Sequence, residues 1–168
     1  TWVTGVQTCA LPISLTGHDH PTLQTAGISL RFVVANPSSY AYFSPQRPVP
    51  FKVADCPGFN DWKYGMQHLP AYAKGQSAEQ LEQAYVSRDI TYLLGQQDTD
   101  PNHPALDKSC EAETQGAYRL IRGHNYFDSL KQRHPQLTQK LVEVPGVGHN
   151  GDGMFTSPEG QNVLFSRY

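Results

Sequence analysis

The most informative part of this chain is residues 89–98, which are Asp89-Ile90-Thr91-Tyr92-Leu93-Leu94-Gly95-Gln96-Gln97-Asp98. A short apolar run closed by a glycine is typical of a buried strand. The acid Asp98 follows almost directly after this run. In open α/β sheets the carboxyl ends of the strands line the crevice in which ligands bind. We therefore expect Asp98 to lie at that edge of a sheet.

The same design returns in residues 140–149, where the expected strand Lys140-Leu141-Val142-Glu143-Val144 leads into a glycine-rich loop and His149. Neighbouring strands would bring Asp98 and His149 to one sheet edge, although 149 − 98 = 51 positions separate them. A carboxylate that orients a histidine forms two members of a nucleophilic triad. Imidazole titrates near neutral pH, so His149 is the candidate general base and Asp98 the candidate acid. No other histidine, His103 included, has such a context.

Other roles for this acidic loop stay open. Asp100, two positions on, competes with Asp98 for the catalytic role, and either acid could be an ordinary loop carboxylate. Asp98-x-Asp100-x-Asn102 also begins like a calcium loop. However, His103 and Ser109 stand where an EF-hand needs glycine and glutamate. We expect neither a metal ion nor a cofactor.

Strands and helices alternate along the chain. Residues 30–35 predict a strand buried on both faces, preceded by a last helical turn at 23–26. A capping box at Ser77 predicts a helix start, and Ser157 with Pro158 predicts another. Residues 109–134 predict a helix that breaks near Gly123 and stops at Pro135. This alternation is typical of an α/β protein with a parallel sheet.

The order and spacing of these motifs resemble the carboxyl-terminal half of an α/β-hydrolase, over residues 23–168. The resemblance is carried by Gly95-x-x-Asp98 after one strand and Gly148-His149 after the next. It implies a partial α/β-hydrolase fold, in which flanking helices cover the last three strands of the sheet. It also implies that the aromatic and proline-rich residues at about 37–76 form a cap.

In that family the chain order is nucleophile, acid, histidine. The resemblance makes residues 31–40 the strand after the nucleophile helix and the turn that follows it. It thereby implies that Asn36, Ser38, Ser39 and Tyr40 line the substrate pocket.

The sequence contains no Gly-x-Ser-x-Gly, the motif that carries the nucleophile in this family. Gly17-His18-Asp19-His20-Pro21 could be an aspartate elbow of the dehalogenase type. Only 30 − 19 = 11 positions then separate Asp19 from the next strand, too few for a long helix and a turn. Ser38 and Ser39 lack flanking glycines.

We therefore expect the nucleophilic serine to lie upstream and this chain to be inactive alone. The longer protein would cleave a small-molecule ester or related acyl bond. The alternative is a non-catalytic binding module with an α/β-hydrolase-like fold.

The amino terminus has an unusual composition. Residues 3–13 resemble the in-frame translation of a sequencing adapter, which indicates a metagenomic or draft-assembly reading frame that begins inside a gene. A genuine amino-terminal arm is the alternative. We expect residues 1–14 to be an artefact and residues 15–168 to be the carboxyl-terminal portion of one α/β-hydrolase domain.

Composition excludes several classes of partner. The net charge is −2, the 13 lysines and arginines form no run, and the apolar runs are far shorter than a membrane span. We expect no nucleic-acid partner and no membrane span. Outside the adapter-like stretch, Cys56 and Cys110 form either one disulfide or two free thiols. A disulfide would favour an exported protein, because such bonds are rare in the cytosol.

Overall fold

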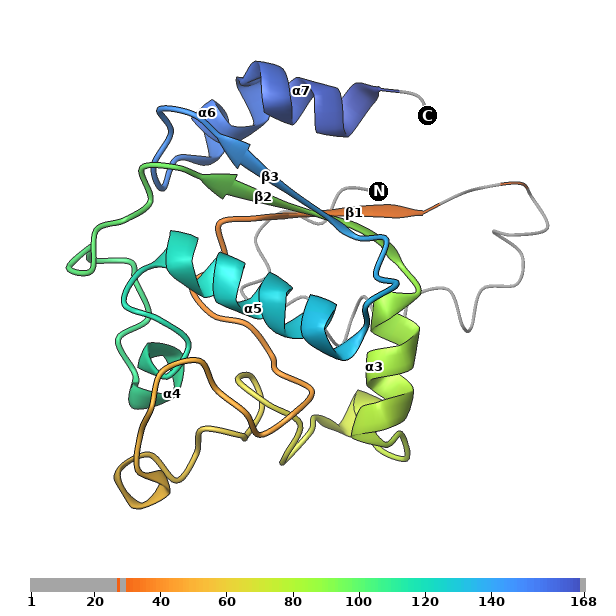
Figure 1. Ribbon diagram of the computed structural model, residues 1–168, viewed down its shortest axis with the longest axis vertical. Coiled ribbons are helices and arrows are strands. Elements are labelled where there is room, and N and C mark those ends of the chain that lie inside the picture. Colours follow the sequence, from red (N-terminus) through yellow and green to blue (C-terminus); the bar gives the residue numbers. More distant parts are fainter. Residues whose placement is uncertain (1–26, 28–29, 167–168) are drawn as a thin grey trace.

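The structure is a computed structural model that describes residue 27 and residues 30–166 (Figure 1). The adapter-like stretch, Asp19 and the helical turn expected at residues 23–26 lie outside the described residues. The described elements, in chain order, are strand β1 (Arg31–Ala35), two 3-10 turns (Val53–Asp55 and Ala71–Ala73), helix α3 (Ala78–Val86), strand β2 (Asp89–Gly95), helices α4 (Cys110–Glu113) and α5 (Arg119–Arg133), strand β3 (Lys140–Val144), and helices α6 (Gly151–Thr156) and α7 (Pro158–Phe165).

The three strands form one parallel sheet in the order β1-β2-β3, as the alternation of strands and helices predicts. β2 lies in the centre, and its residues after Asp89 are all buried. The expectation that residues 30–35 are buried on both faces was wrong for this structure, because only Val34 of β1 is buried. Among the described residues β1 pairs with β2 alone, which leaves β1 at the sheet edge.

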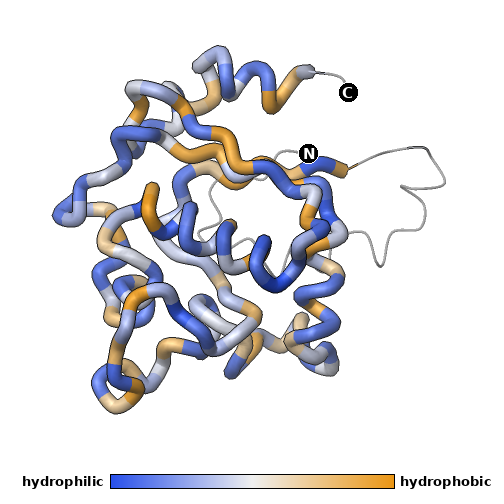
Figure 2. Tube along the Cα trace, viewed as in Figure 1, coloured by the Kyte–Doolittle hydropathy of each residue, from blue (hydrophilic) through white to orange (hydrophobic). Residues whose placement is uncertain are grey.

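Helices cover both faces of the sheet. In Figure 1, α3 and α5 lie on one face, and α6 and α7 lie on the other. Side chains alternate between the faces of a strand. Ile90 and Tyr92 therefore enter the core beneath α5, while Leu93 packs with Met154 of α6. Figure 2 shows mostly hydrophobic strands and a mostly hydrophilic α5. The buried side chains of α5 include Arg119 and Arg122 as well as Leu130.

The expected cap begins inside the core. Residues 36–43 are all buried, and the ring of Tyr40 stacks on Tyr126 of α5 with centroids 4.6 Å apart. Tyr42 meets the same Tyr126 ring edge-on at 5.2 Å. Burial raises the pKa of Tyr126 and of Tyr92 well above the ordinary value, so both phenols stay neutral. This part of the segment packs into the core between the sheet and α5.

The helical region after Asp98 is interrupted, but not at the expected glycine. Helix α4 ends at Glu113, α5 begins at Arg119, and between them Gly116 has a φ of +143°. The predicted break near Gly123 was wrong, because α5 continues through that residue. A Cβ at position 123 would lie 2.5 Å from the Leu94 side chain. Gly123 therefore allows α5 to approach β2 closely.

The other helix ends agree with the sequence. The Ser77 hydroxyl accepts a hydrogen bond from the backbone amide of Gln80, and the Gln80 side chain accepts one from the backbone amide of Ser77. The predicted capping box is therefore confirmed. Ser157 caps α7, with Pro158 at its first position. α5 ends before Pro135, at Arg133. None of the helices in the described part of the chain is long and apolar enough to cross a membrane.

Candidate active site

The acid at the end of β2 is fixed by a tight turn. The amide of Asp98 donates to the carbonyl of Gly95 at 3.0 Å, which folds the chain back over the end of the strand. The Leu120 amide donates to the Asp98 carbonyl at 3.2 Å and ties this turn to the start of α5. Asp98 itself is 3% exposed. A carboxylate this buried needs charged or hydrogen-bonding partners, because its desolvation is costly.

The loop after β3 packs directly against this turn. The Gln97 amide donates to the Val147 carbonyl at 2.9 Å. A Cβ at Gly95 would stand 2.5 Å from that same carbonyl oxygen, so only glycine lets the two loops approach so closely. The Asn150 side chain then caps α6 by accepting from the amides of Asp152 and Gly153. His149 is thereby held between two anchored segments.

The structure brings Asp98 and His149 together. Nδ1 of His149 lies 3.1 Å from Oδ2 of Asp98, and the two side chains are 34% and 2% exposed. An ionised carboxylate only accepts hydrogen bonds, so this contact fits the neutral ring that carries its proton on Nδ1 and its lone pair on Nε2. This arrangement gives a histidine that can take a proton at Nε2 while the carboxylate fixes the ring. Asp100 lies on the exposed surface, where its carboxylate accepts from the Asn102 amide.

The four residues expected to line the substrate pocket are all buried. Asn36 accepts from the Gly95 amide at 2.8 Å and donates to the Gly148 carbonyl at 3.2 Å, so it joins both loops of the site. Ser38 donates to the Ala105 carbonyl, and Ser39 is 1% exposed. The ring of Tyr40 stacks on that of Tyr126. The structure therefore shows these four residues buried, with Asn36 bonded to the loops that carry Asp98 and His149.

One residue that the sequence did not single out lies beside His149. The ring of His103 meets the ring of His149 edge-on, with centroids 5.2 Å apart. Nδ1 of His103 accepts from the Ala105 amide at 3.1 Å. This hydrogen bond makes Nδ1 an acceptor and ties the ring to the backbone of the loop. Because the contact depends on the path of the loop after Asp98, no local motif marks it.

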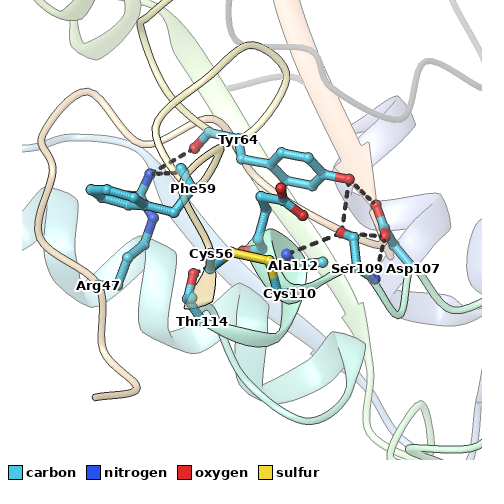
Figure 3. Close-up of a disulfide and its surroundings, with 10 residues drawn as sticks. Arg47, Cys56, Phe59, Tyr64, Asp107, Ser109, Cys110, Ala112 and Thr114 are labelled. Carbon is cyan, nitrogen blue, oxygen red and sulfur yellow. Dashed lines mark hydrogen bonds between the residues drawn. A yellow bond between two sulfur atoms is a disulfide. The ribbon is translucent and has the colours of Figure 1, made fainter. Parts of the chain in front are cut away.

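This loop ends at a disulfide. Cys56 and Cys110 are joined across a sequence separation of 54, which links residues 44–61 to α4 (Figure 3). Glu111 lies beside the two sulfurs, and the three residues form the cluster of possible metal ligands found in the described part of the chain. Because the sulfurs bind each other, no thiolate is left for a metal.

We expect the disulfide to contribute about 4 kcal/mol to stability through the loop it closes in the unfolded chain. Replacing both Cys56 and Cys110 by serine should lower the free energy of unfolding by that amount, measured by urea denaturation. Alkylation of the unreduced, denatured protein provides the chemical check. Cys9, the third cysteine, serves as the internal control. One label per chain is expected, whereas three labels in protein made under oxidising conditions would contradict the bond.

A partly buried carboxylate with several hydrogen-bond partners lies beside the disulfide. Asp107 accepts from the Tyr64 hydroxyl at 2.8 Å and from the Ser109 hydroxyl at 2.8 Å (Figure 3). The ammonium of Lys63 lies 3.1 Å from Oδ2 of Asp107. Burial alone would raise the pKa of Asp107, but hydrogen bonds from Ser109, Tyr64 and Lys63 outweigh burial and lower the pKa to about 2. The ordinary value is 3.8, so the folded state favours the ionised form.

The stabilisation from Asp107 should therefore be complete above about pH 4 and disappear as the pH falls towards 2. Asp107→Asn should destabilise the chain at pH values of about 6, and the difference from the parent should shrink on acidification. Denaturation midpoints across this pH range check the prediction. Asp128→Asn, which changes an exposed acid, is the control. A difference that stays constant with pH would contradict the prediction.

The solved structures that resemble this chain include the following two. Poly(aspartic acid) hydrolase-1 from Sphingomonas sp. KT-1 is 30% identical over 74% of this chain and 41% of its own, with a TM-score of 0.55. LpqC, the poly(3-hydroxybutyrate) depolymerase from Bordetella parapertussis, is 23% identical over 80% of this chain and 40% of its own, with a TM-score of 0.58. No family model and no curated protein matches the chain.

These likenesses, together with the parallel sheet and its flanking helices, define the class. The chain has a partial α/β-hydrolase fold. It spans about two fifths of the length of the two solved proteins. By their names, one of those proteins is a poly(aspartic acid) hydrolase and the other a poly(3-hydroxybutyrate) depolymerase.

Proposed function

We propose that this chain supplies the acid and the histidine of a Ser-His-Asp triad in a hydrolase that cleaves ester or related acyl bonds. In the reaction, Nε2 of His149 takes the proton of a serine as its oxygen attacks the acyl carbon. The same nitrogen then returns the proton to the leaving group. Asp98 keeps the ring in the required tautomer and stabilises the imidazolium that forms. The observation that carries the proposal is the 3.1 Å contact between Nδ1 and a buried carboxylate.

The position of His149 favours this role over a purely structural one. Its side chain is 34% exposed, while its acid partner is 2% exposed. The carboxylate is therefore shielded from water on the Nδ1 side, and the ring remains open for a substrate. A histidine that only stabilised the fold would gain little from this asymmetry. The two solved proteins are named a poly(aspartic acid) hydrolase and a poly(3-hydroxybutyrate) depolymerase, and these names support a reaction at an acyl bond.

The serine and the oxyanion hole of the proposed triad lie upstream of this sequence. The family order nucleophile, acid, histidine supports this placement, since no Gly-x-Ser-x-Gly precedes Asp98 here. The buried position of Ser38 and Ser39 further supports it. The substrate of the longer protein is a small-molecule or polymeric ester, or a related acyl compound.

The test is to recover the upstream gene, express the longer protein, and assay chromogenic short-chain esters beside the 168-residue chain. We expect hydrolysis by the longer protein, a serine in a Gly-x-Ser-x-Gly motif that reacts with a fluorophosphonate, and no activity in the chain alone. An upstream sequence without this serine, combined with no hydrolysis, would favour the non-catalytic binding module. Activity of the chain alone that His149→Ala abolishes would overturn the upstream serine, and Ser38, Ser39 and Asp19 would then be tested.

A further inference from the structure

A fully buried arginine lies behind the acid of the site. Arg119, the first residue of α5, is 1% exposed, and its guanidinium meets Asp98, Ser38 and Ala105. Nη1 donates to Oδ1 of Asp98 at 3.3 Å, Nε donates to the Ser38 hydroxyl at 3.0 Å, and Nη2 donates to the Ala105 carbonyl. The three acceptors come from two loops, one after β1 and one after β2.

Arg119 and His149 contact different oxygens of the Asp98 carboxylate. Oδ1 faces Arg119 at 3.3 Å, and Oδ2 faces His149 at 3.1 Å. A carboxylate with one free oxygen could rotate and lose its alignment with the imidazole. With Oδ1 held by a buried cation, only Oδ2 is presented to His149. Arg119 therefore orients the hydrogen bond on Nδ1 without contacting the histidine.

The second neighbour of His149 depends on the same arginine. The Ala105 carbonyl accepts from Arg119 and from the Ser38 hydroxyl, and the Ala105 amide donates to His103. His103 in turn packs its ring against His149. Both neighbours of the His149 ring are thus anchored at one guanidinium.

We propose that Arg119 is a positioning residue, which sets the tautomer and orientation of His149 by holding Asp98 and the His103–Ala105 turn in place. The proposal rests on the proposed function for its catalytic meaning, but its geometry can be tested in this chain without any turnover. Its distinctive consequence concerns the ring proton of His149. While Oδ2 is correctly presented, the neutral ring should carry its proton on Nδ1.

Helix α5 offers a matched control. Arg122 is also fully buried, and it donates to the carbonyls of Ser38, Gly116 and Asp107 at 2.6 to 2.9 Å. It lies in the same helix as Arg119 and holds some of the same backbone, but its contacts do not include Asp98. A purely structural role would make Arg119 and Arg122 equivalent for the state of His149.

The experiment is long-range ¹H–¹⁵N correlation NMR on the 168-residue chain with ¹⁵N-labelled histidines, at a pH of about 9 where imidazoles are neutral. His149→Gln assigns the signal. We expect the Nδ1–H tautomer to dominate in the parent and in Arg122→Lys, and to become the minor form in Arg119→Met and Arg119→Lys. Thermal unfolding of each variant establishes that it is folded, and Arg119→Lys decides the matter if Arg119→Met does not fold.

An unchanged tautomer in folded Arg119→Lys would overturn the proposal, as would an equal change in Arg122→Lys. A parent chain whose His149 carries its proton on Nε2 would overturn it too. Failure of the proposed function looks different, since the longer protein would then lack esterase activity while the tautomer still depended on Arg119.

Discussion

His149→Ala in the longer, serine-containing protein should lower turnover by on the order of 10⁶, the scale of loss when a triad histidine is removed from a serine hydrolase. The alanine cannot take the serine proton, and no other base replaces it at this position. The neighbouring His103 does not compensate, because its Nδ1 is occupied by the Ala105 amide. Measurement of kcat on a chromogenic ester, with substrate binding assessed through KM, checks the prediction.

His124→Ala is a closely matched control. His124 is also 34% exposed and also pairs with a carboxylate, Glu143, at 2.8 Å. It lies on α5 with its partner on β3, outside the pair formed by Asp98 and His149. Turnover should therefore be nearly unchanged in His124→Ala. A comparable loss in both variants would indicate general damage to the fold, and full activity in His149→Ala would remove this residue from the reaction.

The parts of the site that could be predicted from the sequence depend on local signals. An apolar run closed by Gly95 specifies a strand end, and a glycine-rich loop before His149 specifies another. Parallel pairing of adjacent strands then brings both ends to one edge, since β2 and β3 run side by side in register. The acid and the histidine meet as a consequence of this topology. The predicted helix caps rest on equally local chemistry.

The surroundings of the pair could not be predicted in this way, because they depend on tertiary packing. An arginine in a helix is ordinarily expected to be exposed, and nothing near Arg119 in sequence indicates that it is buried against Asp98. The ring of His103 meets His149 only because the loop after β2 turns back.

The sequence also does not distinguish the structural roles of the two glycines in the helical region. Both weaken a helix on propensity alone, yet Gly116 lies in the break, and Gly123 lies within α5 against β2.

Asp98→Asn in the longer protein should lower turnover by on the order of 10⁴, the loss seen when a triad aspartate becomes asparagine. The asparagine amide can donate to Nδ1 of His149, which would shift the ring proton to Nε2 and leave no base facing the serine. The electrostatic stabilisation of the imidazolium is lost as well. The effect should appear in kcat, because Asp98 is 3% exposed and does not face the substrate.

The same substitution should also reduce stability, since it leaves the guanidinium of Arg119 buried without its ionic partner. Breaking a buried ion pair from one side typically costs about 3–5 kcal/mol. Turnover must therefore be expressed per folded molecule, with the folded fraction taken from circular dichroism and urea titration. Asp100→Asn makes the same chemical change two residues on, at an exposed carboxylate, and should leave both turnover and stability close to those of the parent. An unchanged rate in folded Asp98→Asn, or a larger loss in Asp100→Asn, would transfer the acid role away from Asp98.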